Sequence, residues 1–233
     1  MKKSLFLAGS SLLLAVSLIN PVYAIDKTER IVDEETETII TIKENEGYTT
    51  RAYSGGNEKI TPRSSKNFST MDISSFSMKR GKYAEFYDET LERKGDGHLK
   101  VFSSVDVDYT DTSTSVDYIT LKGYATGFWS GSNPYDADRI TIVPSQTIGA
   151  SGAATAYSYP AAVSVNSTSG ELTFTWPADY RDNAYSYEYE WKKLSARIKG
   201  SGTFKSVIVN DAATFKFGSK GTAILNTLDI AIK

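Results

Sequence analysis

Four aromatic residues alternate along one stretch of the chain and are the sharpest candidates for a ligand-binding site. Tyr185, Tyr187, Tyr189 and Trp191 are separated by single polar residues, and alternate residues of a β-strand lie on one face. If that face is exposed, the rings form a platform for sugar rings or for a membrane interface. The alternative, which we favour, is the core face of a sandwich, because the alternation is typical of a half-buried strand.

Glu188 and Glu190 lie on the opposite face of the same stretch. Same-face residues two apart are roughly 6.5–7 Å apart along a strand, and glycosidases use pairs of carboxylates at similar separations. Catalytic carboxylates face each other across the bound sugar, however, whereas these two side chains point the same way. Ordinary surface glutamates are therefore the favoured interpretation, and a carbohydrate-active enzyme is retained as an alternative.

Two stretches rich in side-chain oxygen atoms raise the question of a metal site. Asp106 and Asp108 lie in the Ser/Thr-rich run 105–121, and Asp136 and Asp138 follow an Asn-Pro pair. Calcium prefers oxygen ligands, but neither stretch has the spacing of an EF-hand loop. Since Asx residues beside Pro are common in turns, we predict no cofactor, with calcium at these four aspartates as the alternative.

His98 is the single histidine, so a Ser-His-Asp triad would have to use it. The chain has no Gly-x-Ser-x-Gly motif, and the neighbouring Gly97 and Leu99 indicate the start of a strand. The absence of Cys excludes disulfides, thiol nucleophiles, cysteine-bound zinc and iron–sulfur clusters. We predict no catalytic residues and a protein that is not an enzyme.

The N-terminus has the features of a secretory signal peptide. Lys2 and Lys3 precede a mostly apolar stretch, residues 5–19, and Val22 to Ala24 suit a cleavage site. An uncleaved anchor is the alternative, but the apolar stretch is short for a membrane span of roughly 20 residues. We therefore expect cleavage after Ala24 and an extracellular protein.

The charge balance bears on the class of partner. Lys and Arg number 26 and Asp and Glu number 28, for a net charge of −2, which does not favour binding to nucleic acid. The partner itself is left open, with a cell-surface glycan or protein as the expected kind.

Residue choice favours an all-β fold. The chain contains 15 Tyr, and aromatic and β-branched side chains suit a pleated, half-buried surface. The recurrent pattern has a period of two, as in Leu172, Phe174 and Trp176, with Gly-, Ser- and Pro-rich breaks between such runs. This pattern predicts an antiparallel β-sandwich of the immunoglobulin-like or jelly-roll type with an N-terminal extension.

Two local features refine this prediction. After Trp191 the apolar positions shift by one, to Leu194, Ala196 and Ile198, so Lys192 and Lys193 mark a β-bulge or a break in the strand. Residues 83–91 fit either a helical face or the first strand of a hairpin. We favour the hairpin, with its turn at residues 94–97, because Gly-Asp-Gly lies between two extended runs.

The organisation along the chain follows from these patterns. We expect a signal peptide over residues 1–24, a charged and polar extension over residues 25–82, and a β-sandwich domain over residues 83–233. The extension either adds strands to the sandwich or hangs free.

Two segments carry a resemblance to a known group of proteins. Residues 127–138, GFWSGSNPYDAD, together with FKFG at residues 215–218, resemble uncharacterised small secreted β-sandwich proteins of Gram-positive bacteria. The similarity covers about the C-terminal half of the chain and implies no activity or functional residue.

Our leading hypothesis is a secreted, non-enzymatic module that binds an extracellular target. The first alternative is a β-pore-forming toxin, in which residues 103–120 insert as a hairpin with Val105, Val107 and Tyr109 facing lipid and with Asp106 and Asp108 facing the lumen. A membrane partner is expected only in that case. The second alternative is the carbohydrate-active enzyme.

Overall fold

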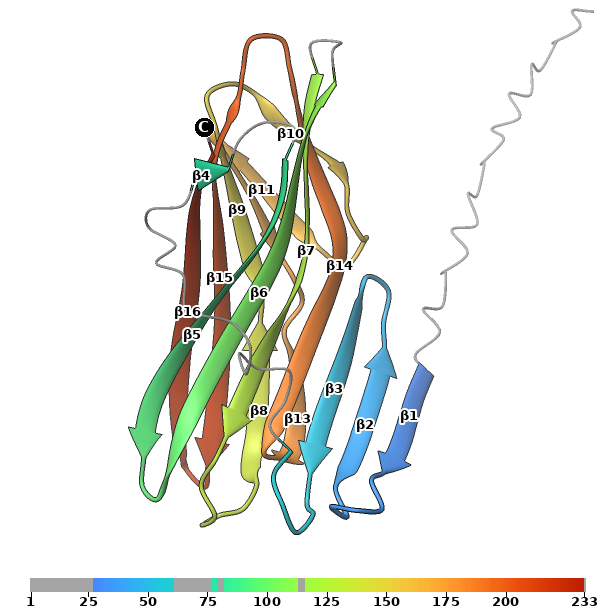
Figure 1. Ribbon diagram of the computed structural model, residues 1–233, viewed down its shortest axis with the longest axis vertical. Helices are drawn as coiled ribbons and strands as arrows, with labels where there is room; N and C mark the ends of the chain where they lie inside the picture. The colour runs from blue at the N-terminus through green and yellow to red at the C-terminus, as the bar shows by residue number, and fades with distance from the viewer. Residues whose placement is uncertain (1–26, 61–76, 79–81, 113–115, 233) are drawn as a thin grey trace, which may run out of the picture.

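The computed structural model describes residues 27–60, 77–78, 82–112 and 116–232. Over these residues the chain forms strands, turns and loops without a helix, and therefore without a helix long and apolar enough to cross a membrane. Two eight-stranded sheets pack face to face along the long axis of the molecule (Figure 1). The predicted all-β antiparallel sandwich is confirmed.

The first sheet, sheet A, is centred on three long strands that run nearly the length of the molecule (Figure 1). They are β6 (Gly97–Thr112), β7 (Val116–Trp129) and β14 (Ser186–Lys199). The short strand β10 (Ala154–Ser158) pairs with the second half of β14, along the edge that β3 (Tyr48–Ser54) occupies on the first half. The strands in spatial order are β1 (Lys27–Val32), β2 (Ile39–Glu44), β3 (Tyr48–Ser54), β14 (Ser186–Lys199), β7 (Val116–Trp129), β6 (Gly97–Thr112) and β5 (Lys82–Lys94), with β10 (Ala154–Ser158) beside β14.

The second sheet, sheet B, is built around the long hairpin of β15 (Phe204–Phe217) and β16 (Lys220–Ile232). All its pairings are antiparallel except a short parallel contact of β4 with β16. The strands in spatial order are β11 (Ser164–Thr168), β12 (Glu171–Thr175), β9 (Ser145–Ala150), β15 (Phe204–Phe217), β16 (Lys220–Ile232) and β4 (Ser77–Met78), with β8 (Ala137–Val143) between β15 and β13 (Asp179–Ala184).

The N-terminal strands belong to sheet A rather than standing apart from it. β3 pairs with β14 from Tyr48 opposite Trp191 to Tyr53 opposite Ser186, and β2 and β1 continue the sheet beyond β3. The domain boundary at residue 83 stays a prediction, but the described part of the extension supplies β1, β2 and β3 to sheet A and the short strand β4 to sheet B.

Both local predictions about strands are confirmed. β5 and β6 form a hairpin in which Lys94 pairs with Gly97 across the turn. Gly95 lies in this turn at φ +56°, in the left-handed region that glycine adopts readily. In β14, the register with β7 shifts between Trp191 and Leu194, which is the predicted bulge.

The core between the sheets is mostly apolar, but a fully buried carboxyl group lies within it. Asp211 of β15 is fully buried, and its Oδ2 accepts a hydrogen bond of 2.6 Å from the Ser103 hydroxyl of β6 in the other sheet. Its Oδ1 has no hydrogen-bond partner among the described residues. Burial raises the pKa of Asp211 to about 7, against the smaller lowering effect of bonds from Ser103 and from the Ser145 backbone N–H.

This geometry predicts a pH-dependent stability that Asp211→Asn removes. A pKa raised in the folded state means that the folded protein is most favoured at pH below about 4, where the unfolded carboxyl is also protonated, and loses stability as the pH rises to about 7. Each pKa unit corresponds to about 1.4 kcal/mol, so D211N should gain a few kcal/mol over the native chain between pH 4 and pH 8.

Urea unfolding at pH 4, 6 and 8 measures this difference. The exposed Asp108, changed to Asn, is the matched control and should leave the pH profile of the native protein unchanged. A constant difference between D211N and the native chain across this range would contradict a neutral buried Asp211.

Candidate functional site

The aromatic ladder lies in the core. Tyr185, Tyr187, Tyr189 and Trp191 are at most 3% exposed. Tyr187, Tyr189 and Trp191 of β14 belong to the core cluster, whereas Tyr185, just before β14, packs against Tyr53, Phe128 and Tyr135. The Tyr189 ring stacks on Tyr48 with 4.5 Å between centroids. The interpretation of these rings as an exposed ligand platform is therefore wrong, and the core interpretation is confirmed by their burial.

Glu188 and Glu190 occupy different environments. Glu188 is buried, accepts a hydrogen bond from Arg51 Nη1 at 3.0 Å in an ion pair, and accepts a second bond from the Tyr53 hydroxyl at 3.4 Å. Glu190 is exposed. Since Glu188 is held by a guanidinium and a phenol, the two do not form a matched pair of catalytic carboxylates.

His98 is exposed at the start of β6. Its backbone N–H donates to the Ser130 hydroxyl at 2.7 Å, and its carbonyl oxygen accepts a hydrogen bond from that residue's backbone. These backbone contacts connect the start of β6 with the end of β7, and the structure gives His98 a place at a strand end, as the sequence indicated.

The four aspartates proposed for calcium are separately engaged. Asp106 pairs with Lys122 at 2.9 Å, and Asp108 accepts a hydrogen bond from Thr110. Asp136 and Asp138 accept hydrogen bonds from the backbone N–H groups of Gly55 and Gly218. The described residues contain no group of three or more acids or histidines that could hold a metal. The prediction of no cofactor stays a prediction, with calcium as its alternative.

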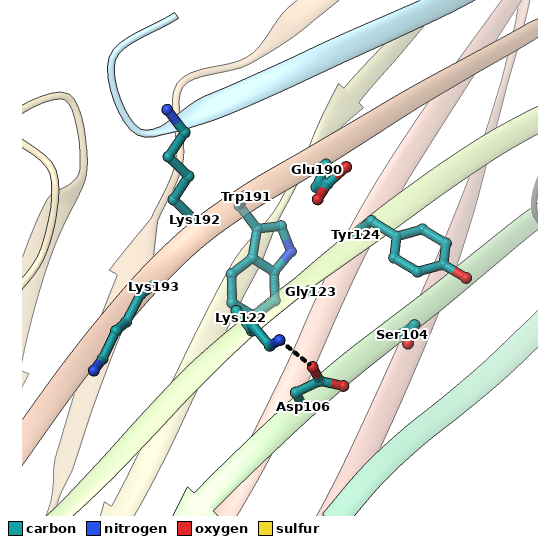
Figure 2. Close-up of a pocket in the computed structure, with 9 residues that line it drawn as sticks. All are labelled: Ser104, Asp106, Lys122, Gly123, Tyr124, Glu190, Trp191, Lys192 and Lys193. Carbon is teal, nitrogen blue, oxygen red and sulfur yellow. Dashed lines mark ion pairs between the residues drawn. The ribbon is translucent and has the colours of Figure 1, made fainter. Parts of the chain in front are cut away.

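A polar pocket of about 320 Å³ lies on the outer face of sheet A, where β14 bulges against β7 (Figure 2). We call it the bulge pocket. Three neighbouring strands supply its lining, which combines amino, carboxyl and hydroxyl groups with one indole. The lining residues are Ser104 and Asp106 of β6, Lys122, Gly123 and Tyr124 of β7, and Glu190, Trp191, Lys192 and Lys193 of β14.

The bulge explains why two lysines meet at this pocket. Trp191 pairs with Gly123 and Leu194 with Leu121, so β14 takes three steps where β7 takes two. The extra residue interrupts the alternation, and Lys192 and Lys193 are both exposed. The shift of the apolar positions by one residue after Trp191 predicted the bulge. It did not show that the neighbouring strands would form a pocket there.

Gly123 shapes the inner wall of the bulge pocket. A Cβ atom at this position would lie 2.1 Å from the backbone oxygen of Ser104 and 2.7 Å from Cζ2 of Trp191. The missing side chain therefore allows the indole to pack beneath β7. The Trp191 Nε1 group is buried and has no hydrogen-bond partner within the described part of the chain.

Three lysines and two carboxylates line the bulge pocket. Lys122 is paired with Asp106 (Figure 2), whereas Lys192 and Lys193 form no ion pair among the residues that the structure describes. Two exposed ammonium groups are suited to an anionic group, and the carboxylates of Asp106 and Glu190 are suited to hydroxyl donors.

Comparisons with known proteins identify no family. No protein-family model and no curated protein match the chain. The solved structures with similar folds include a yeast GGA1 GAE domain, at 10% identity over 61% of this chain and 98% of that one, with a TM-score of 0.22. The collagen-binding domain of a Staphylococcus aureus adhesin shares 12% identity over 63% of this chain and 96% of that one, with a TM-score of 0.21.

A third similar structure contains the manganese lipoxygenase of Gaeumannomyces graminis with part of a zonadhesin of Komagataella pastoris. It shares 7% identity over 88% of this chain and 70% of that one, with a TM-score of 0.21. These low identities and scores carry nothing about the activity or the ligand of the chain.

The geometry around Gly123 predicts that Gly123→Ala destabilises the protein. The added methyl group overlaps a backbone atom of β6 and the Trp191 ring, and overpacking of this kind costs about 1–3 kcal/mol. Urea unfolding measures the loss. Gly221→Ala, also in a strand, is the matched control because, among the described atoms, its Cβ would meet only Phe215 O, at 3.8 Å. Equal stabilities of the two variants would contradict the tight approach at Gly123.

Proposed function

We propose that the protein is a secreted, non-enzymatic module that binds an extracellular partner through the bulge pocket. The single observation that supports this function is the pair of exposed lysines, Lys192 and Lys193, without ion-pair partners among the described residues, beside a polar pocket on a rigid sheet. Side chains held on strands keep their geometry better than side chains on loops, which suits recognition.

The chemistry of the lining favours an acidic saccharide on a cell surface. A carboxylate or sulfate group accepts hydrogen bonds from the two lysines, while sugar hydroxyls donate to Asp106 and Glu190. The presence of acids in the pocket disfavours a dense polyanion such as nucleic acid. The pocket volume of about 320 Å³ is at the small end of ligand pockets, which suits one or two sugar units.

Binding rather than hydrolysis is supported by the state of Glu188. Its carboxylate is buried against Arg51 and Tyr53, on the edge of β14 that faces β3, and it does not line the bulge pocket. The carboxylates that do line the pocket are Asp106 and Glu190. Asp106 is already paired with Lys122 at 2.9 Å, which suits accepting a hydroxyl hydrogen bond better than the proton transfer that glycosidases require. The pocket is therefore better suited to holding a sugar than to cleaving it.

We expect the double variant K192A/K193A to lose at least about tenfold in affinity for heparin, a sulfated glycan, which corresponds to about 1.4 kcal/mol. The reason is the loss of two charge-assisted hydrogen bonds. Binding should also weaken with salt and should be absent for neutral dextran. Surface plasmon resonance on immobilised glycans measures all three.

The matched control is K199A/K216A, which removes the same charge from two exposed positions outside the pocket. An equal loss of affinity in both double variants would show that net charge alone attracts the glycan. Unchanged affinity in K192A/K193A would remove the bulge pocket from the proposal.

A pore-forming toxin is the second candidate, because the hairpin of β6 and β7 has the length and the alternation that it requires. The two strands stay in register from Leu99 opposite Trp129 to Thr112 opposite Val116, which exceeds the roughly 9–11 residues of a membrane strand. Its apolar face is buried against sheet B, so insertion would first have to separate the sheets.

We expect no release of dye from liposomes at pH 5 or pH 7, since the apolar face of this hairpin is covered in the fold. Fluorescence of encapsulated calcein in vesicles with and without anionic lipid measures the release. Rapid release at nanomolar protein would replace the binding module by the toxin as the proposed function.

A further inference from the structure

Three aromatic rings surround the ammonium group of Lys59 at the end of the sandwich that carries the β5–β6 turn and the β7–β8 loop, which is the lower end in Figure 1. Its Nζ lies 4.6 Å from the ring centroid of Tyr135, 5.5 Å from that of Trp129 and 5.6 Å from that of Tyr185. All three distances are within the roughly 6 Å over which a cation is attracted to a ring face.

Backbone oxygens complete the surroundings of this ammonium group. Lys59 Nζ donates a hydrogen bond of 3.1 Å to the carbonyl oxygen of Trp129 and another to that of Gly131. The carboxylates of Asp136 and Asp96 attract the same charge. We call the three rings, the two carbonyl groups and the Asp136 carboxylate the ammonium cage.

Contacts that do not involve Lys59 hold the rings in place. The Trp129 Nε1 group donates to the carbonyl oxygen of Pro134 at 2.8 Å. The Tyr135 and Tyr185 rings meet edge to face with 5.8 Å between centroids, and Tyr185 packs edge to face on Phe128 as well. The cage is thus a preformed receptor that does not depend on its present occupant.

The cage offers more polar atoms than Lys59 uses. The Tyr135 hydroxyl and Asp136 Oδ1 are buried and have no hydrogen-bond partner within the described residues, although buried polar atoms are rarely left unpaired. The other carboxylate oxygen, Asp136 Oδ2, accepts a bond from the Gly55 N–H at 3.1 Å. A ligand with a hydroxyl group beside its ammonium group would give a partner to one of these two atoms.

Lys59 is also an imperfect occupant. Burial lowers the pKa of its amine to about 8, even though Asp136 and Asp96 act in the opposite direction. The charged form thus loses more from leaving water than it regains from the two carboxylates. A competing ammonium ligand that satisfies Tyr135 or Asp136 as well has an energetic advantage over this side chain.

We infer that the ammonium cage is a binding site for a primary ammonium ligand with a neighbouring hydroxyl group, and that Lys59 is its built-in occupant, which such a ligand displaces. The N–H donors are needed for the carbonyl groups of Trp129 and Gly131, which a quaternary ammonium would leave unpaired. The hydroxyl group pairs with the Tyr135 hydroxyl or Asp136 Oδ1. An amino sugar such as glucosamine and a free amino alcohol such as ethanolamine both carry this chemistry.

The test uses Lys59→Met, which keeps the length of the side chain and removes the charge. A tethered occupant competes at a high effective concentration, in the millimolar range. Ethanolamine, titrated calorimetrically, should therefore bind K59M at least about tenfold more tightly than the native chain. Choline, which lacks N–H donors, should bind at least about tenfold more weakly than ethanolamine to the same variant.

Two further variants locate the binding. Asp136→Asn added to K59M should weaken ethanolamine binding, whereas K192A/K193A added to K59M should leave it unchanged, because the bulge pocket is a separate site. Glucosamine should bind K59M as ethanolamine does, whereas glycerophosphoethanolamine, whose ethanolamine oxygen is esterified to phosphate and donates no hydrogen bond, should bind more weakly.

A measurement on the native chain covers the case in which K59M fails to fold. The Lys59 Cε resonance of carbon-13-labelled protein should shift saturably with ethanolamine and should not shift with choline. Absence of saturable binding in folded K59M, equal binding of choline and ethanolamine, or an unmoved Lys59 resonance in the native chain would each overturn the proposal.

Discussion

Large rings on β14 fit into the core because the neighbouring strand β7 has almost no side chains opposite them. Each ring on the inner face of β14 has a glycine or alanine as its partner in the register of β7. The pairs are Tyr187 with Gly127, Tyr189 with Ala125, and Trp191 with Gly123. On the other side of β14, Trp191 pairs with Tyr48 of β3. Complementary sizes across the strands let this aromatic row fill the space between the sheets at native packing density.

The same constraint creates the bulge pocket. Apolar residues face the core on both halves of β14 only if the alternation of inward and outward positions shifts by one residue after Trp191. The chain inserts one residue there, which leaves Lys192 and Lys193 both exposed on the outer side. Gly123, which makes room for the Trp191 ring, is also part of the pocket wall. The candidate site is therefore a consequence of how the core is packed.

Sequence patterns predicted the features that local spacing controls. The strands followed the alternation of apolar residues, the β5–β6 turn followed Gly-Asp-Gly, and the bulge followed the parity break at Lys192. The aromatic row was correctly favoured as core because its polar neighbours alternate with it. The sequence could not reveal which strands become neighbours, because strand order depends on pairings such as β3 with β14, whose residues are more than 130 positions apart.

Long-range contacts explain why the remaining features had no sequence signal. Ser103 and Asp211 meet only because β6 and β15 lie opposite each other in different sheets. Lys59 reaches Trp129 and Tyr185 from loops that converge at one end of the sandwich. The two sites also select opposite charges, since the bulge pocket presents ammonium groups and the ammonium cage presents carbonyl oxygens and a carboxylate. The two sites share strand β7 but use different parts of it, since the bulge pocket is lined by residues 122–124 and the ammonium cage uses Trp129 at the end of the strand. A loss of binding at one need not disturb the other.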